Sequence, residues 1–566
     1  MPADVNSSHT EPNQRRTRLF ACLLLLLGLC FITNFFYYRE WGLYEDDYIW
    51  IMTLPPLNWS FAELSLKIKE IWLRWVHFQC RPVGFSANVI IAYAGSFFSS
   101  LGPSYLVGYC IFAANSTLLF FVTNRAFGAR FAWVAVVTYF TFPADTSKQI
   151  LMHRHVHVSE TLLLVALLLF QRRHTTWAYI VAGISLATYE SLYLPFIAAP
   201  FIASRLPNWR EILRHGIVFS MIAIIGLYVR SLSGDDRAEL ITGGLLTIAG
   251  KMASACVIGL GTASGAALHT IPTALSSSTN LDLTMLVIIA ALLVTSFCAQ
   301  MIHTAPQPTQ PNRIVWIQAI IFAAAVAFSY VLAFRPAYYP PVSTIGRASG
   351  VNVAAAVPFG IFFASLDRAF LNHFISIYAK RAQTAILLMM LACWSIYGVH
   401  IQRAEYSENW QRHQKPLWLL LIENAHRMEA DTPILVDMKG FPSTPGFPAE
   451  GFVGTKAFSA LSDFIAFPSP PTNAPRVFGY SSTTPHKLES TGLKLSTPIW
   501  NQDLWPTISN ETFYHVAFKD GKFTFTTDPI SIGNTTIKPR DLLSTPKHLD
   551  RALRTGGSIV FEIPKR

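Results

Sequence analysis

Three consecutive carboxylates, Glu45, Asp46 and Asp47, form the first cluster of residues that could carry chemistry. Aromatic residues flank the cluster, with Tyr44 directly before it and Tyr48 directly after it. Neighbouring carboxylates raise one another's pKa, and burial raises it further, which suits a general base or a metal ligand. A solvated acidic turn that helps to fix membrane topology would have the same residues, so both interpretations stay open from position alone.

Arg81, which is followed by Pro82, is the first candidate cation. It comes after a segment, 61–78, in which apolar residues are interleaved with lysine, glutamate and arginine, a pattern that predicts an amphipathic helix lying on a membrane surface. An arginine at the level of lipid headgroups can hold a phosphate through its paired N–H donors. Ordinary snorkelling of the side chain toward headgroups is the alternative.

Two further clusters lie near the ends of apolar runs. His153, His155 and His157 alternate along the chain, so that all three share a face in a strand, whereas only the first and last share a face in a helix. Either arrangement could bind a metal or a phosphate, and an interfacial role without a ligand is the alternative. Tyr189 and Glu190 end another apolar run, where a costly carboxylate favours contact with a substrate hydroxyl.

Arg347 precedes an apolar run that begins with small residues. This position suits a cation buried against a cavity and directed at a phosphate. A topology signal or a headgroup anchor explains the residue equally well.

The composition shows what kind of scaffold must position these residues. Only 14% of the 566 residues are charged and 52% are hydrophobic, with a mean hydropathy of +0.35. A soluble protein has about 25% charged residues, so the deficit indicates a chain whose outer surface is mostly lipid. These values exclude a soluble enzyme, a disordered scaffold or a coiled coil as a description of the whole chain. The seven cysteines lie mainly in apolar runs, which argues against a disulfide framework.

The apolar runs predict an α-helical polytopic membrane protein of about eleven spans. They lie at about 19–38, 104–123, 131–143, 159–170, 176–190, 192–204, 215–230, 283–302, 314–334, 349–366 and 382–399. A cytoplasmic tail, 1–18, then places the arginine-rich loops inside, as the positive-inside rule requires. The net charge of +11 is therefore mainly a topology signal rather than a sign of nucleic-acid binding. The segment 82–101 is expected to lie in the membrane interface, because counting it as a span would invert every later loop.

The tail after the last span, 401–566, changes character and becomes rich in proline, threonine and serine. Short runs with the pattern of β-strands occur at Thr432–Asp437, Phe513–Phe518, Phe523–Thr527 and Ser558–Ile563. An odd number of spans places this tail outside the cytoplasm. We therefore expect a small extracytoplasmic β or α/β domain.

The order of these features resembles the GT-C superfamily of polytopic glycosyltransferases. Its members have a first span, an external loop that opens with an acidic pair, surface helices and a basic residue followed by proline before the second span. Among them, the chain most resembles the bacterial inner-membrane enzymes that use polyprenyl-phosphate sugars, such as the glucosyltransferases that decorate O-antigen. The resemblance covers roughly the first 400 residues as an architecture, and the tail matches no motif.

The resemblance implies a fold, a reaction and a site. The membrane domain would span 19–400, with a catalytic first external loop at 39–103 that carries the base. Glu45, Asp46 and Asp47 occupy the place of that base, and Arg81 with Pro82 matches the basic element. The reaction would be a single-displacement, inverting transfer of a sugar, a hexose by analogy, from a polyprenyl phosphate to a glycan or lipid-linked acceptor of the cell envelope. Asp46 or Asp47 is preferred as the base, because Glu45 should point away from Asp46 in an extended segment.

Arg81, Arg347 and the histidines are expected to stabilise the departing phosphate, which leaves well without a protonated acid. The sequence has no recognisable ligand spacing for a divalent metal, so metal dependence stays open. The expected partners are the lipid-linked donor, the acceptor and membrane lipids, with no nucleic acid. The expected location is the bacterial inner membrane, with the N-terminus in the cytoplasm.

Two other functions fit a polytopic chain with envelope substrates, a transporter or flippase and a polysaccharide polymerase. Transporters commonly place ionisable residues near the middle of the bilayer. Here the acids gather at the outer ends of the predicted spans, which favours an enzyme. A polymerase would also work at that rim, but it would not require an acidic cluster directly after the first span.

Overall fold

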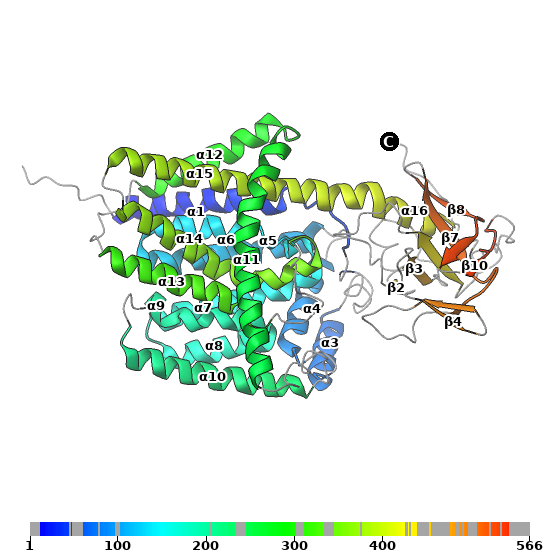
Figure 1. The fold of residues 1–566 in the computed structure, drawn as a ribbon, viewed down its shortest axis with the longest axis horizontal. Coiled ribbons are helices and arrows are strands. Elements are labelled where there is room, and N and C mark those ends of the chain that lie inside the picture. The colour runs from blue at the N-terminus through cyan, green and yellow to red at the C-terminus, as the bar shows by residue number, and fades with distance from the viewer. Residues whose placement is uncertain are drawn as a thin grey trace, which may run out of the picture.

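The computed structural model describes residues 12–44, 47, 60–76, 80–96, 102–203, 207–232, 245–301, 311–332, 344–373, 376–424, 428, 432–437, 452–453, 476–480, 486–489, 492–495, 507–519, 522–532 and 535–542. Within these residues the chain forms a bundle of apolar helices, followed by a small region of strands (Figure 1).

Every apolar run that was predicted as a span contains a helix. In chain order the helices are α1 (Pro12–Phe35), α5 (Gly102–Phe127), α6 (Ala129–Phe140), α7 (Arg154–Gln171), α8 (Thr175–Thr188), the 3-10 helix η3 (Glu190–Ala198) with α9 (Ala199–Ala203), α10 (Trp209–Ser231), α12 (Leu283–Met301), α13 (Asn312–Phe328), α14 (Val353–His373) and α15 (Ile377–His400). These helices run alongside one another (Figure 1). The sequence therefore predicted the apolar helices correctly.

The number of spans is a separate question from the number of helices. Among the described residues, six helices are long and apolar enough to cross a membrane, and five of them belong to the predicted runs. Several other runs form shorter apolar helices, such as Ala129–Phe140 and Thr175–Thr188. The structure thus supports a membrane protein with several spanning helices, whereas the count of about eleven goes beyond what helix length shows.

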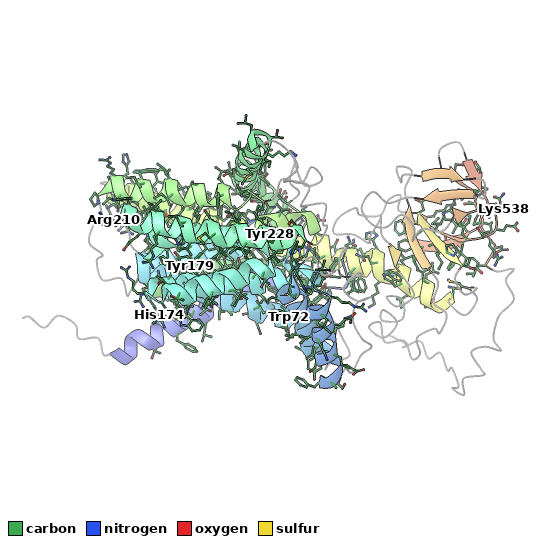
Figure 2. The ribbon with its side chains drawn as sticks, turned by 90° about the horizontal axis from the view of Figure 1, so that it is seen from below. Trp72, His174, Tyr179, Arg210, Tyr228 and Lys538 are labelled. Carbon is green, nitrogen blue, oxygen red and sulfur yellow. The ribbon has the colours of Figure 1, made fainter. Side chains whose placement is uncertain are left out.

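The sixth long helix, α11 (Leu245–Ser278), lies between the predicted runs at 215–230 and 283–302. It runs across the bundle helices rather than alongside them, and the view turned by 90° looks along it (Figures 1 and 2). It packs against α13 and α15, where the indole N–H of Trp394 donates to the backbone oxygen of Ala267 at 2.8 Å. Its crossing direction agrees better with a helix lying on the bundle than with a parallel span.

Two helices, α3 and α4, lie between α1 and α5 in the described part of the chain. Helix α3 (Phe61–Leu73) begins with a capping box in which Ser60 and Glu63 satisfy each other's backbone N–H groups. Its Leu64 and Ile71 are buried, whereas most of its other apolar side chains are exposed, as expected for a surface helix. Helix α4 (Pro82–Ser96) packs against α5, α7 and α8.

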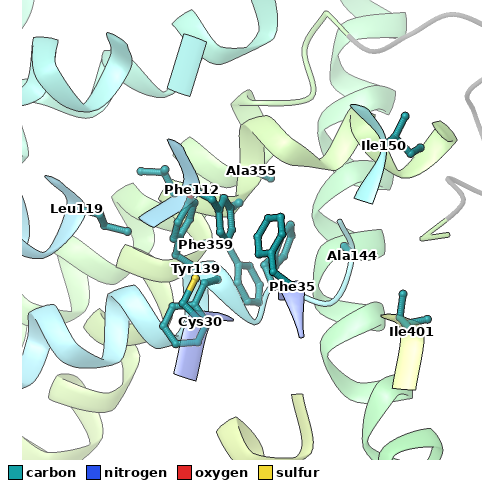
Figure 3. Close-up of a cluster of buried hydrophobic side chains, with 14 of the residues drawn as sticks. Cys30, Phe35, Phe112, Leu119, Tyr139, Ala144, Ile150, Ala355, Phe359 and Ile401 are labelled. Atoms are coloured by element: carbon teal, nitrogen blue, oxygen red, sulfur yellow. The ribbon is translucent and has the colours of Figure 1, made fainter. Parts of the chain in front are cut away.

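The core of the bundle lies where α1, α5, α6 and α14 meet. Figure 3 shows part of it, with Phe35, Phe112, Tyr139 and Phe359 packed together. The Phe112 and Tyr139 rings stack with centroids 5.1 Å apart. Large aromatic side chains bury much apolar surface each, so this cluster fixes how the four helices pack.

The helical structure continues past His400, where the tail domain was predicted to begin. Two π-helical segments, η7 (Ile401–Ser407) and η8 (Trp410–Gln414), connect α15 to α16 (Lys415–Asn424). Apolar residues of this stretch, such as Trp410 and Trp418, are buried. The change in composition after residue 400 therefore marks a change in helix type and surroundings. Within the described residues, the first strand begins at Pro433.

The strands form a mixed sheet of the order β2-β3-β1-β7-β8. Its members are β1 (Pro433–Asp437), β2 (Phe452–Val453), β3 (Arg476–Tyr480), β7 (Tyr514–Lys519) and β8 (Lys522–Thr526). β1 is parallel to β3 and β7, while β7 and β8 form an antiparallel hairpin. Helix α16 packs against β8. A smaller sheet contains β4 (His486–Glu489), β5 (Gly492–Leu495) and β6 (Thr507–Ile508). A further pair consists of β9 (Ile530–Ile532) and β10 (Thr535–Ile537).

Three of the four predicted strands are confirmed. Thr432–Asp437, Phe513–Phe518 and Phe523–Thr527 coincide with β1, β7 and β8 to within one residue at each end. The run at Ser558–Ile563 lies outside the described residues. The tail thus contains the expected small β-rich region, with a parallel core that is typical of α/β structure.

Candidate active site

Asp47 is the member of the acidic cluster whose position is described, whereas Glu45 and Asp46 lie outside the described residues. Its carboxylate is fully buried and accepts two backbone hydrogen bonds, from the N–H of Tyr44 at 3.2 Å and from that of Met152 at 2.7 Å. Burial raises the pKa of Asp47 to about 8, although these hydrogen bonds and the charge of Arg154 oppose the rise. A carboxylate with such a pKa is a stronger base than an exposed aspartate.

Arg154, the first residue of α7, is also fully buried. None of its three guanidinium nitrogens makes a hydrogen bond within the part of the chain that the structure describes. The guanidinium carbon lies 5.5 Å from the ring centroids of both Phe35 and Tyr105. Gly108 leaves room for it, since a Cβ there would come within 2.2 Å of the guanidinium carbon. A desolvated cation is thus held near Asp47 by aromatic rings rather than by a salt bridge.

The loop that carries Asp47 is held by the π-helical segment after α15. The indole N–H of Trp41 donates to the backbone oxygen of Gln402 at 3.3 Å, and the Tyr44 hydroxyl donates to that of Tyr406 at 2.9 Å. The Tyr406 hydroxyl in turn donates to the backbone oxygen of Thr146 at 2.8 Å. Because π-helical turns often occur at functional sites, this segment is a good candidate for the element that positions the loop.

A second charged cluster joins three separate segments of the chain. Arg81 donates to Glu190 through Nε at 3.0 Å and Nη2 at 2.6 Å, and Arg230, near the end of α10, forms an ion pair with the same carboxylate. The side chain of Arg81 is 8% exposed, that of Glu190 15% and that of Arg230 11%. The guanidinium of Arg81 also lies 4.7 Å from the ring centroid of Tyr189.

Two arginines and one glutamate form a cluster with one net positive charge, and its guanidinium groups can bind phosphate. The sequence predicted Arg81, Tyr189 and Glu190 as site residues, and the structure brings them together. It changes the interpretation of Glu190, which was expected to contact a substrate hydroxyl and instead binds two arginines. Arg230 was missed, although an arginine that closes an apolar run at the end opposite the arginine-rich loops was a visible signal.

The backbone before Arg81 is unusual. Cys80 adopts a positive φ of 55° and is buried, and the helix α4 begins two residues later at Pro82. A left-handed conformation is costly for a residue with a Cβ. This turn sets the direction in which Arg81 leaves the chain toward Glu190.

The three histidines have different surroundings. His155 lies in the arginine cluster's neighbourhood, with its ring centroid 5.8 Å from that of Tyr189 and its Nδ1 2.7 Å from the backbone oxygen of Met152. His157 instead lies 3.3 Å from the Oε2 atom of Glu160, in the interior of the bundle. Among the described contacts, His155 and His157 therefore bind different groups rather than one shared partner.

His153 and the backbone at Arg347 belong to two further segments that carry predicted site residues. A Cβ at Gly350 would come within 2.8 Å of the His153 ring, so that ring packs directly against the 3-10 helix η6 (Arg347–Asn352). The backbone N–H of Gly346 donates to the Thr146 hydroxyl at 3.2 Å. The backbone at Arg347 is thereby fixed beside the segment around Thr146, while the Arg347 side chain lies outside the described structure.

Met152 connects the two charged clusters. Its N–H binds Asp47, and its backbone oxygen accepts from Asn88 at 3.1 Å and approaches His155 at 2.7 Å. His155 contacts Tyr189, which packs on Arg81. Asp47 is therefore linked to the arginine cluster through Met152, His155 and Tyr189.

A buried polar network deeper in the bundle was not predicted. The Oε2 atom of Glu160 accepts from the Tyr139 hydroxyl at 2.6 Å and from Asn115 at 3.1 Å. Lys148, also buried, donates to Asn34 at 3.2 Å and to the backbone oxygen of Phe140 at 3.0 Å. These contacts join α1, α5, α6, α7 and the segment of Lys148 in the interior of the bundle, which is a structural role. The sequence signal for it was a glutamate inside an apolar run.

The described residues contain no group of three or more histidine, cysteine, aspartate or glutamate side chains that could hold a metal ion. The chain matches no family model, no curated protein and no solved structure.

Proposed function

We propose that the chain is an inverting glycosyltransferase that moves a sugar, a hexose by analogy, from a polyprenyl-phosphate donor to a glycan or lipid-linked acceptor of the cell envelope. The observation that carries this proposal is the convergence of a buried carboxylate, Asp47, with the Arg81–Glu190–Arg230 cluster through Met152 and Tyr189. Such a pair of groups meets the two chemical needs of the transfer, a base and a cationic site for the leaving phosphate.

Asp47 is the proposed base. It takes the proton of the acceptor hydroxyl as that oxygen forms its bond to the anomeric carbon of the donor sugar. The bond from that carbon to the phosphate oxygen breaks at the same time, and its electron pair leaves with the phosphate. The raised pKa of Asp47, about 8, increases its affinity for the proton. Because Asp47 is fully buried, acceptor binding must displace a neighbouring group to reach it.

Arg81 and Arg230 are the proposed phosphate ligands. The phosphate gains negative charge as the bond breaks, and guanidinium groups already aligned by Glu190 stabilise that charge without reorganisation. Arg154 acts on the proposed base, Asp47, rather than on the phosphate. Its positive charge opposes the burial penalty on ionised Asp47 and so keeps the base form accessible.

The membrane setting supports the same proposal. The chain has several helices long and apolar enough to span a membrane, which suits a lipid-linked donor. In this proposal the site lies on the outer face of the bacterial inner membrane. Asp46 is the alternative base, as in the prediction from sequence.

The test is a transfer assay with full-length protein in proteoliposomes, supplied with radiolabelled polyprenyl-phosphate hexoses. Variants Arg81→Gln and Arg230→Gln are compared with Arg210→Gln, an exposed arginine at the opposite end of α10. The proposal predicts transfer by the wild type and by Arg210→Gln, and strong loss in the two cluster variants. Equal activity in all four proteins would exclude the cluster as the phosphate site.

A further inference from the structure

A pocket lies between α7, α8, α9 and α10, at the end of the bundle opposite Glu190. Helix α8 begins at this pocket with Thr175 and ends at Thr188, while α10 runs from beside the pocket to Arg230, which pairs with Glu190. Figure 2 shows His174 and Arg210 at this end and Tyr228 toward the other. The pocket is therefore separated from the proposed active site by about the length of α8, and α10 spans the same separation.

The pocket is open and has a cavity volume of about 160 Å³. This is smaller than the roughly 300–1,000 Å³ that is usual for sites that enclose a whole small molecule, so it suits a headgroup rather than a complete ligand. Its inner wall is formed by Phe170, Tyr179, Pro200, Ala203 and His215. The ring nitrogens of His215 lie 2.9 Å from the Tyr179 hydroxyl and 3.0 Å from the backbone oxygen of Phe196. These contacts hold the His215 ring in place, while Phe170, Pro200 and Ala203 make much of the wall apolar.

The mouth of the pocket is charged. Arg173, Arg214 and Glu211 line it, so positive charge exceeds negative. The pair between Arg173 and Glu211 is loose, at 3.9 Å, with side chains 73% and 53% exposed, and such surface pairs contribute little. Arg214 forms no ion pair with any described residue. Two guanidinium groups are thus available for an anion.

Beyond the pocket, the outer surfaces of α8 and α10 are apolar. Ile180 and Ile184 of α8, and Ile217, Met221 and Ile224 of α10, are all exposed. A helix surface with this composition on a membrane protein faces acyl chains. A ligand that fits both features has an anionic head at the arginines and hydrocarbon chains along the two helices.

We propose that this pocket binds an anionic glycerophospholipid, whose phosphate is held by Arg173 and Arg214 and whose acyl chains lie along α8 and α10. Basic pockets between transmembrane helices on the cytoplasmic side bind anionic headgroups in other membrane proteins. The arginine-rich loops predicted to be cytoplasmic place this pocket on that side. The site is distinct from the donor site in position and does not depend on the proposed function.

Native mass spectrometry of the full-length protein in detergent, titrated with phosphatidylglycerol or phosphatidylcholine, measures the binding. Both lipids contain a phosphate, but only the first has a net negative charge. The wild type is expected to prefer phosphatidylglycerol. The double variant Arg173→Gln/Arg214→Gln should lower its apparent affinity about tenfold. The control Arg210→Gln removes a neighbouring arginine of α10 that lies over the Trp209 ring and not in the pocket, and it should change affinity less than about twofold.

Two further measurements separate this site from diffuse surface charge and from soluble anions. Ala203→Phe fills the pocket without changing its charge and should weaken phosphatidylglycerol binding as the arginine variant does. Glycerol phosphate should fail to displace the lipid at equal concentration, because it lacks the acyl chains. The proposal is overturned by equal affinity for the two lipids, by an equal effect of Arg210→Gln, by full binding in Ala203→Phe, or by efficient displacement by glycerol phosphate.

Discussion

Replacing Glu190 with glutamine distinguishes two roles for this carboxylate. The sequence predicted a contact with a substrate hydroxyl, whereas the structure shows Glu190 paired with Arg81 at 2.6 Å and with Arg230. Glutamine keeps the shape of the side chain and removes its charge. If Glu190 serves to balance and align the arginines, the variant should unfold more easily. Its affinity for the donor phosphate should stay the same or rise, because the cluster then carries two net positive charges.

The magnitude follows from burial. All three side chains are at most 15% exposed, so water screens the pairs only weakly. Removing one partner of a buried ion pair costs about 3–5 kcal/mol. The amide oxygen of glutamine still accepts one arginine hydrogen bond, which retains about 1 kcal/mol. We therefore expect the free energy of unfolding to fall by about 2–4 kcal/mol.

The assay is equilibrium unfolding of the purified protein in mixed micelles, combined with donor and acceptor KM values from the transfer assay. Glu211→Gln is the matched control, since that carboxylate is 53% exposed and pairs with Arg173 only at 3.9 Å. It should leave both stability and KM unchanged. Unchanged stability in Glu190→Gln, with a raised KM for the acceptor, would refute the charge-balancing role and restore the substrate-hydroxyl contact.

Four other predictions concern the residues of the site. Activity should rise with pH through a pKa of about 8, because a protonated Asp47 cannot accept a proton. In a pH–rate profile, Arg154→Met should move this rise to higher pH, since the positive charge of Arg154 lowers the pKa of Asp47. A rise at the same pH in the variant would contradict the influence of Arg154 on Asp47. Because the pKa of Asp47 is raised above the ordinary value of 3.8, its contribution to the free energy of unfolding is present below pH 3.8 and is lost as pH rises toward 8. In Asp47→Asn the free energy of unfolding should no longer fall with pH over this range. Tyr406→Phe removes the hydrogen bond to Thr146 and should lower kcat more than donor affinity, unlike Tyr378→Phe, whose exposed ring lies at the far end of α15. Cys80→Gly should be tolerated at the positive φ of Cys80, while Cys80→Val should cost about 1–3 kcal/mol in thermal unfolding; equal stability of the two variants would show that the turn is not strained.

Much of the fold could be predicted because it depends on local patterns. Long apolar runs form helices in a membrane, since the backbone groups must be satisfied within the segment. Alternating short runs in the tail likewise predicted β1, β7 and β8. Helix direction was harder, because α11 has the length and composition of a span, yet its packing against α13 and α15 turns it across the bundle.

The site was predictable in part for the same reason. The residues at the ends of apolar runs, such as Arg81 and Glu190, were recognisable because charges there are costly. Their pairing was not, since Arg230 lies 149 positions after Arg81 and only tertiary packing brings them to one carboxylate. The role of Tyr406 was equally hidden, because composition changes near residue 400 while the helix continues into its π-helical segment.

The central claim is that this bundle transfers a sugar with Asp47 as the base, and a transfer assay on Asp47→Asn tests it most directly. The wild type in proteoliposomes should move radiolabel from a polyprenyl-phosphate hexose to an acceptor. Asp47→Asn should lose about 10²–10⁴-fold in rate, and a cooperative unfolding transition at pH 8 that comes no earlier than that of wild type shows that the variant folds. Full activity in Asp47→Asn would contradict the account, as would a folded wild type that transfers no hexose from any such donor.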